Sequence, residues 1–360
     1  MVKRLNLLKV PDDLINNQLL NKFIDETLPK NYNFEIHKTI WRIKCLKAKK
    51  VALQMPEGLL LFSLAIINVI KMFTFQDDIE FIIFGDVTYG ACCIDDISAK
   101  ALGVDILVHY GHSCLIPVED ISVLYIFVDI KIDMNHLIET IKRNISKKMK
   151  LGFVSTVQFV SSLHMAKLEL EKDGYEIQIP QSFPLSPGEI LGCTSPKVEN
   201  ADAIIYLGDG RFHLESIMIS NQTLEFYRYD PYSKKFTQEK YDHVSMKRNR
   251  KKSIEKAISG NTFGIILGTL GRQGNYKVLE YLEKEFQDLN KNTITLLLSE
   301  IYPAKLALFK DKVDAWIQIA CPRLSIDWGT EFDKPLLSTY EASVVIRLLK
   351  NADSVSILGQ

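Results

Sequence analysis

One β-α-β-α-β pattern recurs three times along this 360-residue chain, and this repeat constrains the fold more than any other feature. The apolar strands that open the three copies begin at Val51, Leu151 and Phe263, at intervals of 100 and 112 residues. The third strand of each copy begins with a small or β-branched residue followed by an aspartate, and these aspartates are Asp105, Asp202 and Asp314. Two markers with nearly the same offsets indicate repeated domains rather than a short-repeat solenoid.

The pattern predicts an α/β fold of three pseudo-repeated domains packed around a central site. Each domain is expected to be a small, mostly parallel sheet with flanking helices. The first domain covers residues 1–148 and includes helical lead-in segments, the second covers 149–255, and the third covers 256–360. A chain of 360 residues with 47% apolar content is long enough to bury several cores.

Hydrophobic periodicity places the individual elements. Lead-in helices are predicted over 17–28 and 34–50. Strands are predicted over 51–56, 80–85, 105–110, 124–129, 151–156, 175–180 and 203–208, followed by a β-rich stretch over 218–236. The basic run 247–252 is interpreted as the solvated first turn of a linking helix, or else as a basic edge for an acidic protein or RNA partner. The last ten residues are expected to fray.

Charge and hydropathy exclude some classes of partner. Lys plus Arg equals Asp plus Glu at 44 each, so no global preference for nucleic acid or membrane follows. No apolar run reaches about 18 residues, and the N-terminus lacks a signal-peptide core. We therefore expect a cytoplasmic protein with neither nucleic acid nor membrane as partner. Six cysteines in such a chain indicate thiols, catalytic groups or metal ligands before disulfides.

Polar and glycine-rich residues follow the predicted strands, where ligands bind in parallel sheets. The candidates at these strand ends are Gln54, Asp86, His112, Gln158, Asp209, Gly271, Arg272, Gln273 and Cys321. Each has a structural alternative, because glycines also form turns and polar residues also cap helices. Their recurrence at three sets of strand ends favours a common site.

Three cysteines, Cys92, Cys193 and Cys321, lie at related but not equivalent places in the three repeats. If the repeats share a centre, each can deliver one thiolate to a single metal. Tetrahedral zinc would need a fourth ligand, for which Cys93 or His112 could be proposed. Three thiolates instead suit a four-iron cluster with an open iron, although no local iron–sulfur motif is present.

The other cysteines are interpreted as buried or spare thiols. These are Cys45, Cys93 and Cys114.

Several long segments together resemble a known family. They are KNYNFEIHKTIWRI, VALQMPEGLLLF, FGDVTYGACCIDDISAKALGVDILVHYGHSCL, VSTVQF, ILGCTSP, YLGDGRFHLES, ILGTLGRQGN, LLLSEIYPAKLALF and VDAWIQIACPRLSIDWG. Over roughly residues 28 to 345 the chain resembles the diphthamide biosynthesis enzyme family, and within it the first-type, catalytic subunits.

The resemblance implies a chemistry. A [4Fe-4S] cluster would be held by Cys92, Cys193 and Cys321, with S-adenosylmethionine as co-substrate on the unique iron. The reduced cluster would generate a 3-amino-3-carboxypropyl radical, which would add to a histidine of translation elongation factor 2. The resemblance also implies a heterodimer with a second-type subunit and a small electron-donor protein. Such cofactor chemistry needs the protein for ligands, orientation and exclusion of side reactions.

Further roles are assigned under the same resemblance, with no catalytic residue named. Candidates for binding S-adenosylmethionine are Gln54, Asp86, Gln158, Asp209, Gly271, Arg272 and Gln273, with Arg272 and Gln273 on the carboxylate and amine of the methionine moiety. Candidates for supporting roles are His112 and His213, as proton carriers or structural histidines, and Arg323 and Asp327, which are expected to pair and order the loop after Cys321.

Three alternatives stay open. A quinolinate-synthase-like enzyme also uses three pseudo-repeated domains with one cysteine from each, but the strings GDVTYGACC and GTLGRQGN argue against it. A non-catalytic partner subunit would lack the full set of functional residues, and Cys193 argues for the catalytic member. A zinc-stabilised scaffold is separated from both by iron and sulfide analysis. For a shared cluster, the three sulfur atoms are predicted to lie within about 7 Å of one another.

Overall fold

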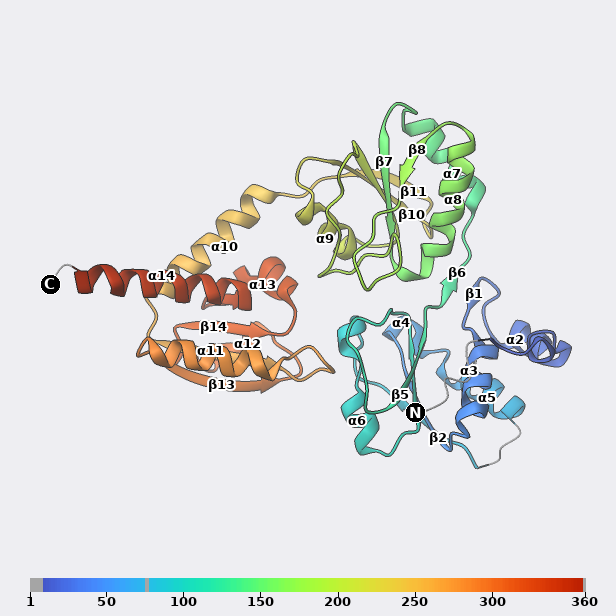
Figure 1. The fold of residues 1–360 in the computed structure, drawn as a ribbon, viewed down its shortest axis with the longest axis horizontal. Coiled ribbons are helices and arrows are strands. Elements are labelled where there is room, and N and C mark those ends of the chain that lie inside the picture. Colours follow the sequence, from blue (N-terminus) through green and yellow to red (C-terminus); the bar gives the residue numbers. More distant parts are fainter. Residues whose placement is uncertain (1–8, 75–77, 359–360) are drawn as a thin grey trace. The chain divides into compact units, whose positions relative to one another are not determined.

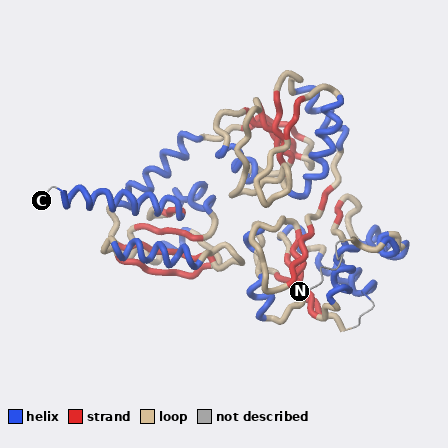
Figure 2. Tube along the Cα trace, viewed as in Figure 1, coloured by secondary structure: helices blue, strands red, loops and turns tan. Residues whose placement is uncertain are grey.

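The structure is a computed structural model that describes residues 9–74 and 78–358, with side chains to residue 351. The chain divides into two compact units, Met1–Lys240 and Tyr241–Gln360. Within them the described residues form three sheets of four or five mostly parallel strands, flanked by helices (Figures 1 and 2). The predicted α/β class is confirmed. The boundaries of the three predicted domains stay a prediction, although each repeat has a sheet of its own.

The first sheet has the strand order β3-β2-β4-β5, and all its strands are parallel. Its strands are β2 (Lys50–Gln54), β3 (Glu80–Phe84), β4 (Ile106–Tyr110) and β5 (Ser122–Ile126). Its helices are α1 (Asp12–Ile15), α2 (Gln18–Thr27), α3 (Ile36–Leu46), α4 (Glu57–Leu60), α5 (Ser63–Thr74), the 3-10 turn η1 (Ala91–Cys93) and α6 (Asp96–Ala101). A separate antiparallel pair joins β1 (Tyr32–Asn33) to β6 (Asp129–Ile130). The strand predicted over 124–129 thus begins two residues earlier and ends at Ile126.

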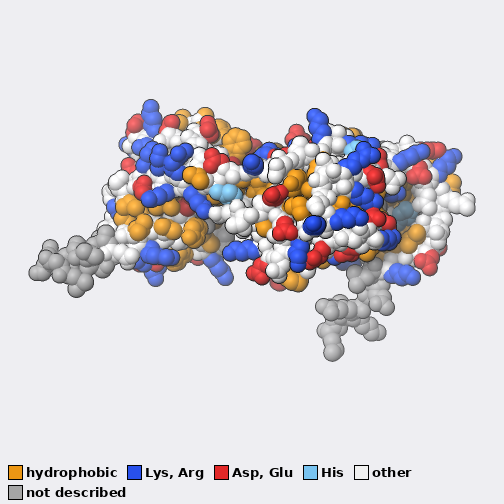
Figure 3. All heavy atoms as spheres, turned by 90° about the horizontal axis from the view of Figure 1, so that it is seen from above, with side chains coloured by type: hydrophobic (Ala, Val, Ile, Leu, Met, Phe, Trp, Pro, Cys, Tyr) orange, Lys and Arg blue, Asp and Glu red, His pale blue; other side chains and the backbone are white. Residues whose placement is uncertain are grey.

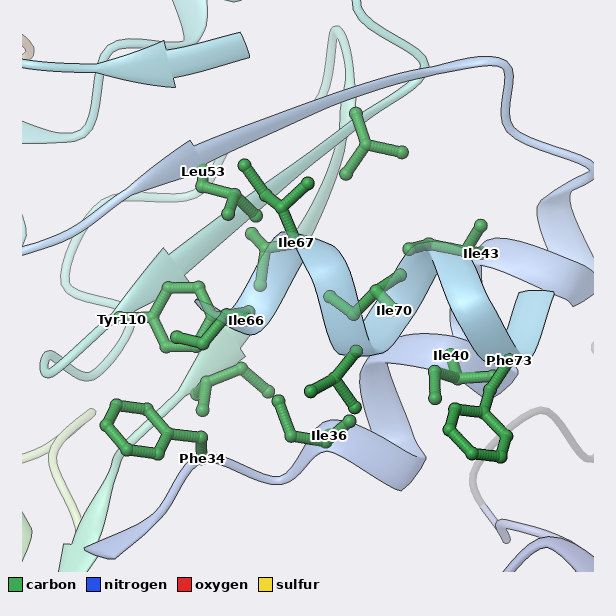
Figure 4. Close-up of a cluster of buried hydrophobic side chains, with 14 of the residues drawn as sticks. Phe34, Ile36, Ile40, Ile43, Leu53, Ile66, Ile67, Ile70, Phe73 and Tyr110 are labelled. Carbon is green, nitrogen blue, oxygen red and sulfur yellow. The ribbon is translucent and has the colours of Figure 1, made fainter. Parts of the chain in front are cut away.

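Helix α5 supplies much of the core beneath the first sheet (Figure 4). Ile66 and Ile70 are fully buried, and Phe73 is 7% exposed, a spacing of three to four residues that places all three on one face of the helix. They pack in one cluster with Leu53 of β2 and Tyr110 of β4. Burying each such side chain stabilises the fold by about 1.5–3 kcal/mol. The core therefore holds the strands whose ends carry polar residues.

The second sheet has the order β11-β10-β9-β7-β8. Its strands are β7 (Lys150–Ser155), β8 (Glu176–Gln178), β9 (Ala203–Leu207), β10 (Glu225–Asp230) and β11 (Lys235–Glu239), and its helices are α7 (Met134–Asn144), η2 (Val157–Phe159), α8 (Val160–Lys172) and α9 (Phe212–Ser220). The β-rich stretch predicted over 218–236 begins too early, because its first residues end α9. Leu214, Ile217 and Met218 are fully buried at helical spacing, and this burial outweighs the local strand signal.

The second unit contains the third sheet, of order β13-β12-β14-β15, which is entirely parallel. Its strands are β12 (Thr262–Gly268), β13 (Asn292–Leu298), β14 (Ala315–Ile319) and β15 (Leu336–Ser338). Its helices are α10 (His243–Ile258), α11 (Tyr276–Asp288), α12 (Pro303–Ala307), α13 (Pro322–Trp328), η3 (Gly329–Glu331) and α14 (Thr339–Leu358). The expected fraying of the last ten residues is wrong for the backbone as far as Leu358, which is helical. The final two residues lie outside the described chain.

The basic run 247–252 corrects a second expectation. It lies in the middle of α10 rather than in its first turn, and it is not wholly solvated, since Arg250 is only 7% exposed. Arg250 donates from Nε and Nη2 to the Glu341 carboxylate, at 2.6 and 2.8 Å. One cation of the run therefore faces α14. On the face that Figure 3 shows, positive and negative side chains are interspersed.

Glu341 also helps to cap the N-terminus of helix α14. Its Oε2 accepts from the backbone N–H of Ser338, at 2.8 Å, while the Ser338 hydroxyl oxygen accepts from the Glu341 N–H, at 3.3 Å. These reciprocal bonds form a capping box, which satisfies N–H groups that the first helical turn cannot pair. One buried carboxylate thus caps α14 and binds the guanidinium of α10.

The aspartates that mark the three repeats have a common structural role. Each accepts backbone N–H groups at the start of the first strand of its own repeat. The bonds run to Asp105 Oδ2 from the N–H groups of Lys49 and Lys50 (2.8 and 2.9 Å), to Asp202 Oδ2 from Lys150 (2.8 Å), and to Asp314 Oδ2 from Asn261 and Thr262 (2.8 and 2.9 Å). A charged acceptor thus ties the beginnings of two neighbouring strands together.

Replacing Asp314 by asparagine should therefore weaken the second unit in a pH-dependent way. The N–H groups of Thr262 and Asn261 hold the pKa of Asp314 below its usual value. A lowered folded-state pKa means that this stabilisation is fully present above the unfolded pKa, near 3.8, and is lost as the pH falls through the folded pKa. At this exposed position we expect a loss of about 1 kcal/mol or less at pH 7.

The measurement is urea unfolding of the parent, Asp314→Asn and the exposed control Asp311→Asn between pH 7 and pH 3. The gap between parent and Asp314→Asn should close in acid. A gap that is constant over this range would show that the Asp314 charge is not what stabilises the strand pair.

Candidate functional site

A cavity of ≈ 320 Å³ opens in the first unit where strands of the first two sheets end. Pro56 and His112 follow β2 and β4, and Gln158 and Asp209 follow β7 and β9; all four line the cavity. His213, on α9, lines it as well. The strand-end rule thus brings together His112, Gln158, Asp209 and His213 from the predicted set.

A chain of hydrogen bonds leads to His112 from the segment after β3. The Gln54 amide donates from Nε2 to the Cys93 carbonyl, at 2.7 Å, and its Oε1 accepts from the Asp95 N–H, at 3.2 Å. His109 Nδ1 lies 3.0 Å from the same Oε1, and His112 Nδ1 lies 3.3 Å from His109 Nε2. The chain fixes the orientation of His112 at the cavity.

His109 and His112 are both neutral at physiological pH. Burial lowers the pKa of His109 to about 4. Burial, with additional repulsion from His109 and His213, lowers the pKa of His112 to about 3. The cavity therefore faces an uncharged imidazole.

Glu189 belongs to the second repeat, lines the cavity and is fully buried. Its Oε2 accepts from the Ser113 hydroxyl, at 2.6 Å, and from the Ser186 N–H, at 3.1 Å. Its Oε1 has no hydrogen-bond partner among the described residues. Burial raises the pKa of Glu189, although the bonds from Ser113 and Ser186 oppose this. A carboxyl group held in this way is a strong acceptor for a donor that enters the cavity.

Two predicted residues of the first repeat, Gln54 and Asp86, do not line this cavity. Gln54 is 3% exposed, and both its amide nitrogen and its amide oxygen form hydrogen bonds within the protein. Asp86 is exposed after β3, and its carbonyl accepts from the Thr88 hydroxyl at 3.3 Å. Their role in binding S-adenosylmethionine stays a prediction, and for Gln54 the structure provides a role in orienting His109.

The predicted cluster cysteines occupy three different local structures. Cys92 lies in the 3-10 turn η1 after β3 and is partly exposed. Cys193 is exposed in a tight turn in which the N–H groups of Leu191 and Thr194 bond each other's carbonyls, at 2.8 and 3.4 Å. Cys321 is partly exposed at the N-terminus of α13, immediately after β14. Cys92 and Cys321 follow the carboxyl ends of β3 and β14, and Cys193 follows the isolated bridge between Ser155 and Glu189.

The carbonyl of Cys321 is held by a buried side chain. Gln318 of β14 is 2% exposed and donates from Nε2 to the Cys321 carbonyl, at 2.7 Å. In the first repeat, Gln54 holds the Cys93 carbonyl at the same distance. The predicted pairing of Arg323 with Asp327 is confirmed, with Nε to Oδ2 and Nη2 to Oδ2 distances of 2.8 Å. This ion pair braces the turn of α13 that follows Cys321.

Gly271, Arg272 and Gln273 form part of the loop between β12 and α11 in the second unit. Gly271 has φ +56, a left-handed conformation that glycine adopts without strain. All three residues are partly buried. Their role in ligand binding stays a prediction.

Cys92, Cys193 and Cys321 have the chemistry that ligands of an iron–sulfur cluster need. Among the described residues no disulfide joins any two of the six cysteines, and no group of three or more His, Cys, Asp or Glu side chains is already gathered as a metal site. Cys92, Cys193 and Cys321 are each accessible to solvent, whereas Cys93 is 1% exposed. Soft thiolates are the ligands that iron–sulfur clusters take. Because Cys321 belongs to the second unit, the convergence of the three sulfur atoms stays a prediction.

Comparison with known proteins defines the class. Residues 55–355 match the family described as "Putative diphthamide synthesis protein". The chain belongs to this diphthamide synthesis family.

Relatives within the family narrow the assignment. The chain is 57% identical to 2-(3-amino-3-carboxypropyl)histidine synthase subunit 1 of Nematostella vectensis, over 94% of this chain and 72% of the relative. It is 54% identical to the Homo sapiens protein of the same name, over 94% of this chain and 77% of the relative. The Schizosaccharomyces pombe protein of that name is 53% identical, over 95% and 79%. The chain thus groups with relatives named as subunit 1, as the resemblance indicated.

Solved structures agree. Dph2 from Pyrococcus horikoshii with a 4Fe-4S cluster has a TM-score of 0.72 and 26% identity to this chain, covering 88% of this chain and 91% of that one. A second structure of Dph2 from the same organism has a TM-score of 0.73, also at 26% identity. In the described part of the chain, no helix has the length and apolarity needed to cross a bilayer.

Several residues of the site escaped sequence analysis. They are His109, Ser113, Glu189 and Gln318. His109 and Gln318 are polar residues inside apolar strands, ILVHY and AWIQI, and that anomaly could have identified them. Glu189 gave no such signal, because it lies in a loop whose fold depends on long-range contacts.

Proposed function

We propose that this chain transfers the 3-amino-3-carboxypropyl group of S-adenosylmethionine to a histidine of translation elongation factor 2, the first step of diphthamide biosynthesis. The observation that carries the proposal is identity above 50% over nearly the whole chain to relatives named as subunit 1 of 2-(3-amino-3-carboxypropyl)histidine synthase. The cluster in the similar Dph2 structure supports it. No separate observation favours a quinolinate-synthase-like reaction, a non-catalytic partner or a zinc scaffold.

Cys92, Cys193 and Cys321 would hold a [4Fe-4S] cluster. When bound, such a cluster supplies the electron that cleaves the bond between the sulfur and the γ-carbon of S-adenosylmethionine, giving a 3-amino-3-carboxypropyl radical. With three thiolate ligands from the protein, the fourth iron is left for the co-substrate. The hydrogen bond from Gln318 to the Cys321 carbonyl and the Arg323–Asp327 pair would keep the Cys321 loop in place.

The cavity of the first unit would exclude water from the reacting groups and orient them. Its lining is largely apolar, and Gln158, Asp209, His112 and His213, which are among its polar members, would bind the substrate. A neutral His112 can accept a hydrogen bond or a proton, which an imidazolium cannot. The proposed role of these residues is to bind and orient the substrate. The carbon–carbon bond itself would form between the co-substrate and the acceptor histidine.

Partners follow from the same proposal. The name subunit 1 of the relatives supports a complex with a second-type subunit. A small electron-donor protein would reduce the cluster. Because its protein substrate works in translation, the chain is proposed to act in the cytoplasm.

The test of the proposed function is an anaerobic assay of the reconstituted protein, alone and with its second-type subunit. S-adenosylmethionine labelled in the aminocarboxypropyl group, elongation factor 2 and a reductant are supplied. We expect label on the histidine of the factor and an equal amount of methylthioadenosine. Formation of 5′-deoxyadenosine, or of quinolinate from its precursors, would contradict the proposal.

Arg272 provides a prediction about the co-substrate. A guanidinium bound to the methionine carboxylate makes a charge-assisted bidentate contact. Arg272→Ala should keep iron content and fold but weaken S-adenosylmethionine binding by about thirtyfold, or about 2 kcal/mol. Arg272→Lys should recover only part, because a point charge cannot make the planar contact.

Titration of S-adenosylmethionine into the reconstituted protein measures this effect. Lys277→Ala, on the exposed first turn of α11, serves as the control for loss of a nearby charge. Unchanged affinity in both Arg272 variants would remove Arg272 from the site.

A further inference from the structure

We propose that the cavity of the first unit binds a heteroaromatic ring that carries N–H groups, and that Glu189 and His112 are the two acceptors that recognise it. The inference rests on the proposed function, which supplies two rings of this chemistry. One is the imidazole of the acceptor histidine, and the other is the adenine of S-adenosylmethionine.

The first acceptor is Glu189. It is fully buried, yet only one of its two oxygens is satisfied: Oε2 binds Ser113 and Ser186, while Oε1 has no partner among the described residues. A buried carboxylate oxygen without a donor is unfavourable, and native proteins rarely leave one unpaired. Because Glu189 lines the cavity, an N–H group of a bound ligand can supply the missing bond.

The second acceptor is His112, whose tautomer is set from a distance. Gln54 donates to the Cys93 carbonyl with its nitrogen, so its oxygen is the end that faces His109. His109 must therefore donate from Nδ1, which leaves its Nε2 as an acceptor. His112 then donates to that nitrogen from its own Nδ1, at 3.3 Å.

It follows that Nε2 of His112 carries a lone pair and no proton. Because burial keeps the His109 and His112 imidazoles uncharged, a protonated form of His112 that would donate from Nε2 is not populated at neutral pH. The cavity thus presents two hydrogen-bond acceptors, one from each of the first two repeats, and each acceptor is fixed by bonds behind it. This arrangement selects a ligand with donor groups.

The walls define the shape and charge of the ligand. Tyr32, Phe127 and Tyr232 give aromatic surfaces against which a planar ring can stack. The cavity, at ≈ 320 Å³, lies in the size range of small-ligand sites. Among the described residues that line it, the charged side chains are Glu189 and Asp209, with no Lys or Arg. A phosphate or another anion is therefore disfavoured, and a neutral or cationic ring is favoured.

The experiment measures ligand binding by the full-length, cluster-free protein with calorimetry and saturation-transfer NMR. The probes are 5′-methylthioadenosine, N-acetylhistidine methylamide and adenosine 5′-monophosphate. We expect at least one of the first two to bind, and the monophosphate to bind about tenfold or more weakly than methylthioadenosine if adenine is the ring. Binding of methylthioadenosine identifies the co-substrate as the source of the ring, and binding of the histidine amide alone identifies the acceptor.

The variant Glu189→Gln tests the recognition itself. The Ser186 N–H can only donate, so it keeps the amide oxygen at the present Oε2 position and directs the amide NH₂ to the position of Oε1. A ligand N–H would then meet another donor. We expect affinity for the bound ring to fall at least about tenfold, while Glu199→Gln, an exposed change of the same type, leaves it unaltered.

His112→Phe is the second variant, for use if Glu189→Gln fails to fold as judged by circular dichroism. It removes the acceptor nitrogen and keeps an aromatic ring, and it should weaken binding to a similar degree. The inference is overturned if neither ring binds to the parent, or if a folded variant binds as the parent does. A parent that binds neither ring but transfers the aminocarboxypropyl group would sink this inference alone; one that binds a ring but transfers nothing would sink the proposed function alone.

Discussion

Alanine in place of Cys92, Cys193 or Cys321 is expected to abolish transfer and to remove most bound iron. Each thiolate would ligate one iron of the cluster, and the described residues contain no ready-made group of three or more metal-ligating side chains that could replace it. Loss of one of three ligands leaves an iron uncoordinated and the cluster open to hydrolysis. Iron and sulfide content after anaerobic reconstitution, together with the visible absorption of the cluster, measures the effect independently of activity.

The neighbouring thiols are the controls. Cys45 and Cys114 variants should keep iron and transfer activity. Cys93 is the informative one, because it adjoins Cys92 but is buried at 1% exposure in the turn η1. If Cys93→Ala lost the cluster while Cys92→Ala kept it, the assignment would be wrong by one residue.

The largest effect on stability is expected at Arg250. The side chains of Arg250 and Glu341 are both 8% exposed, and removing one member of a buried pair leaves the other charge uncompensated. Arg250→Met should therefore lower the free energy of unfolding of the second unit by about 3–5 kcal/mol. Urea unfolding followed by circular dichroism gives this value.

Two further variants separate charge from packing. Lys251→Met changes the adjacent, exposed residue of the same helix and should cost about 0.5 kcal/mol or less. The double variant Arg250→Met, Glu341→Gln should be more stable than Arg250→Met alone, since an amide retains an acceptor for the Ser338 N–H without a buried charge. A double variant no better than the single one would show that packing of the Arg250 stem, and not the ion pair, is what the fold requires.

Regular elements were the part of the fold that sequence could predict. Strand positions in the first two repeats agree within about three residues, because apolar runs such as VAL at 51–53 and AIIYL at 203–207 have only one reasonable placement in a buried parallel sheet. The start of the stretch 218–236 was misread because Met218 belongs to α9, and its burial there depends on residues far away in the sequence. Arg250 was misread for the same reason: its partner Glu341 is 91 residues away.

The site shows a similar division. Strand-end residues His112, Gln158 and Asp209 were predicted, since parallel strands deliver their carboxyl ends to one edge. His109, which orients His112, was not predicted, and neither were Ser113 and Glu189. Ser113 and Glu189 meet across two repeats, and pairings of this kind leave no local pattern in the chain.

The three strand-start aspartates lie at the ends of the sheets opposite those that carry the candidate cysteines and the cavity. In each repeat, the aspartate that ties two strands together and the residues proposed to carry the chemistry are therefore separate sets, at opposite ends of the sheet. An inherited change at Asp105, Asp202 or Asp314 would reduce the amount of folded protein in a cell without altering what each folded molecule does. A change at a cavity residue would instead alter the function of each folded molecule without altering the amount of folded protein. A measurement of protein abundance would therefore detect the first kind of change and miss the second.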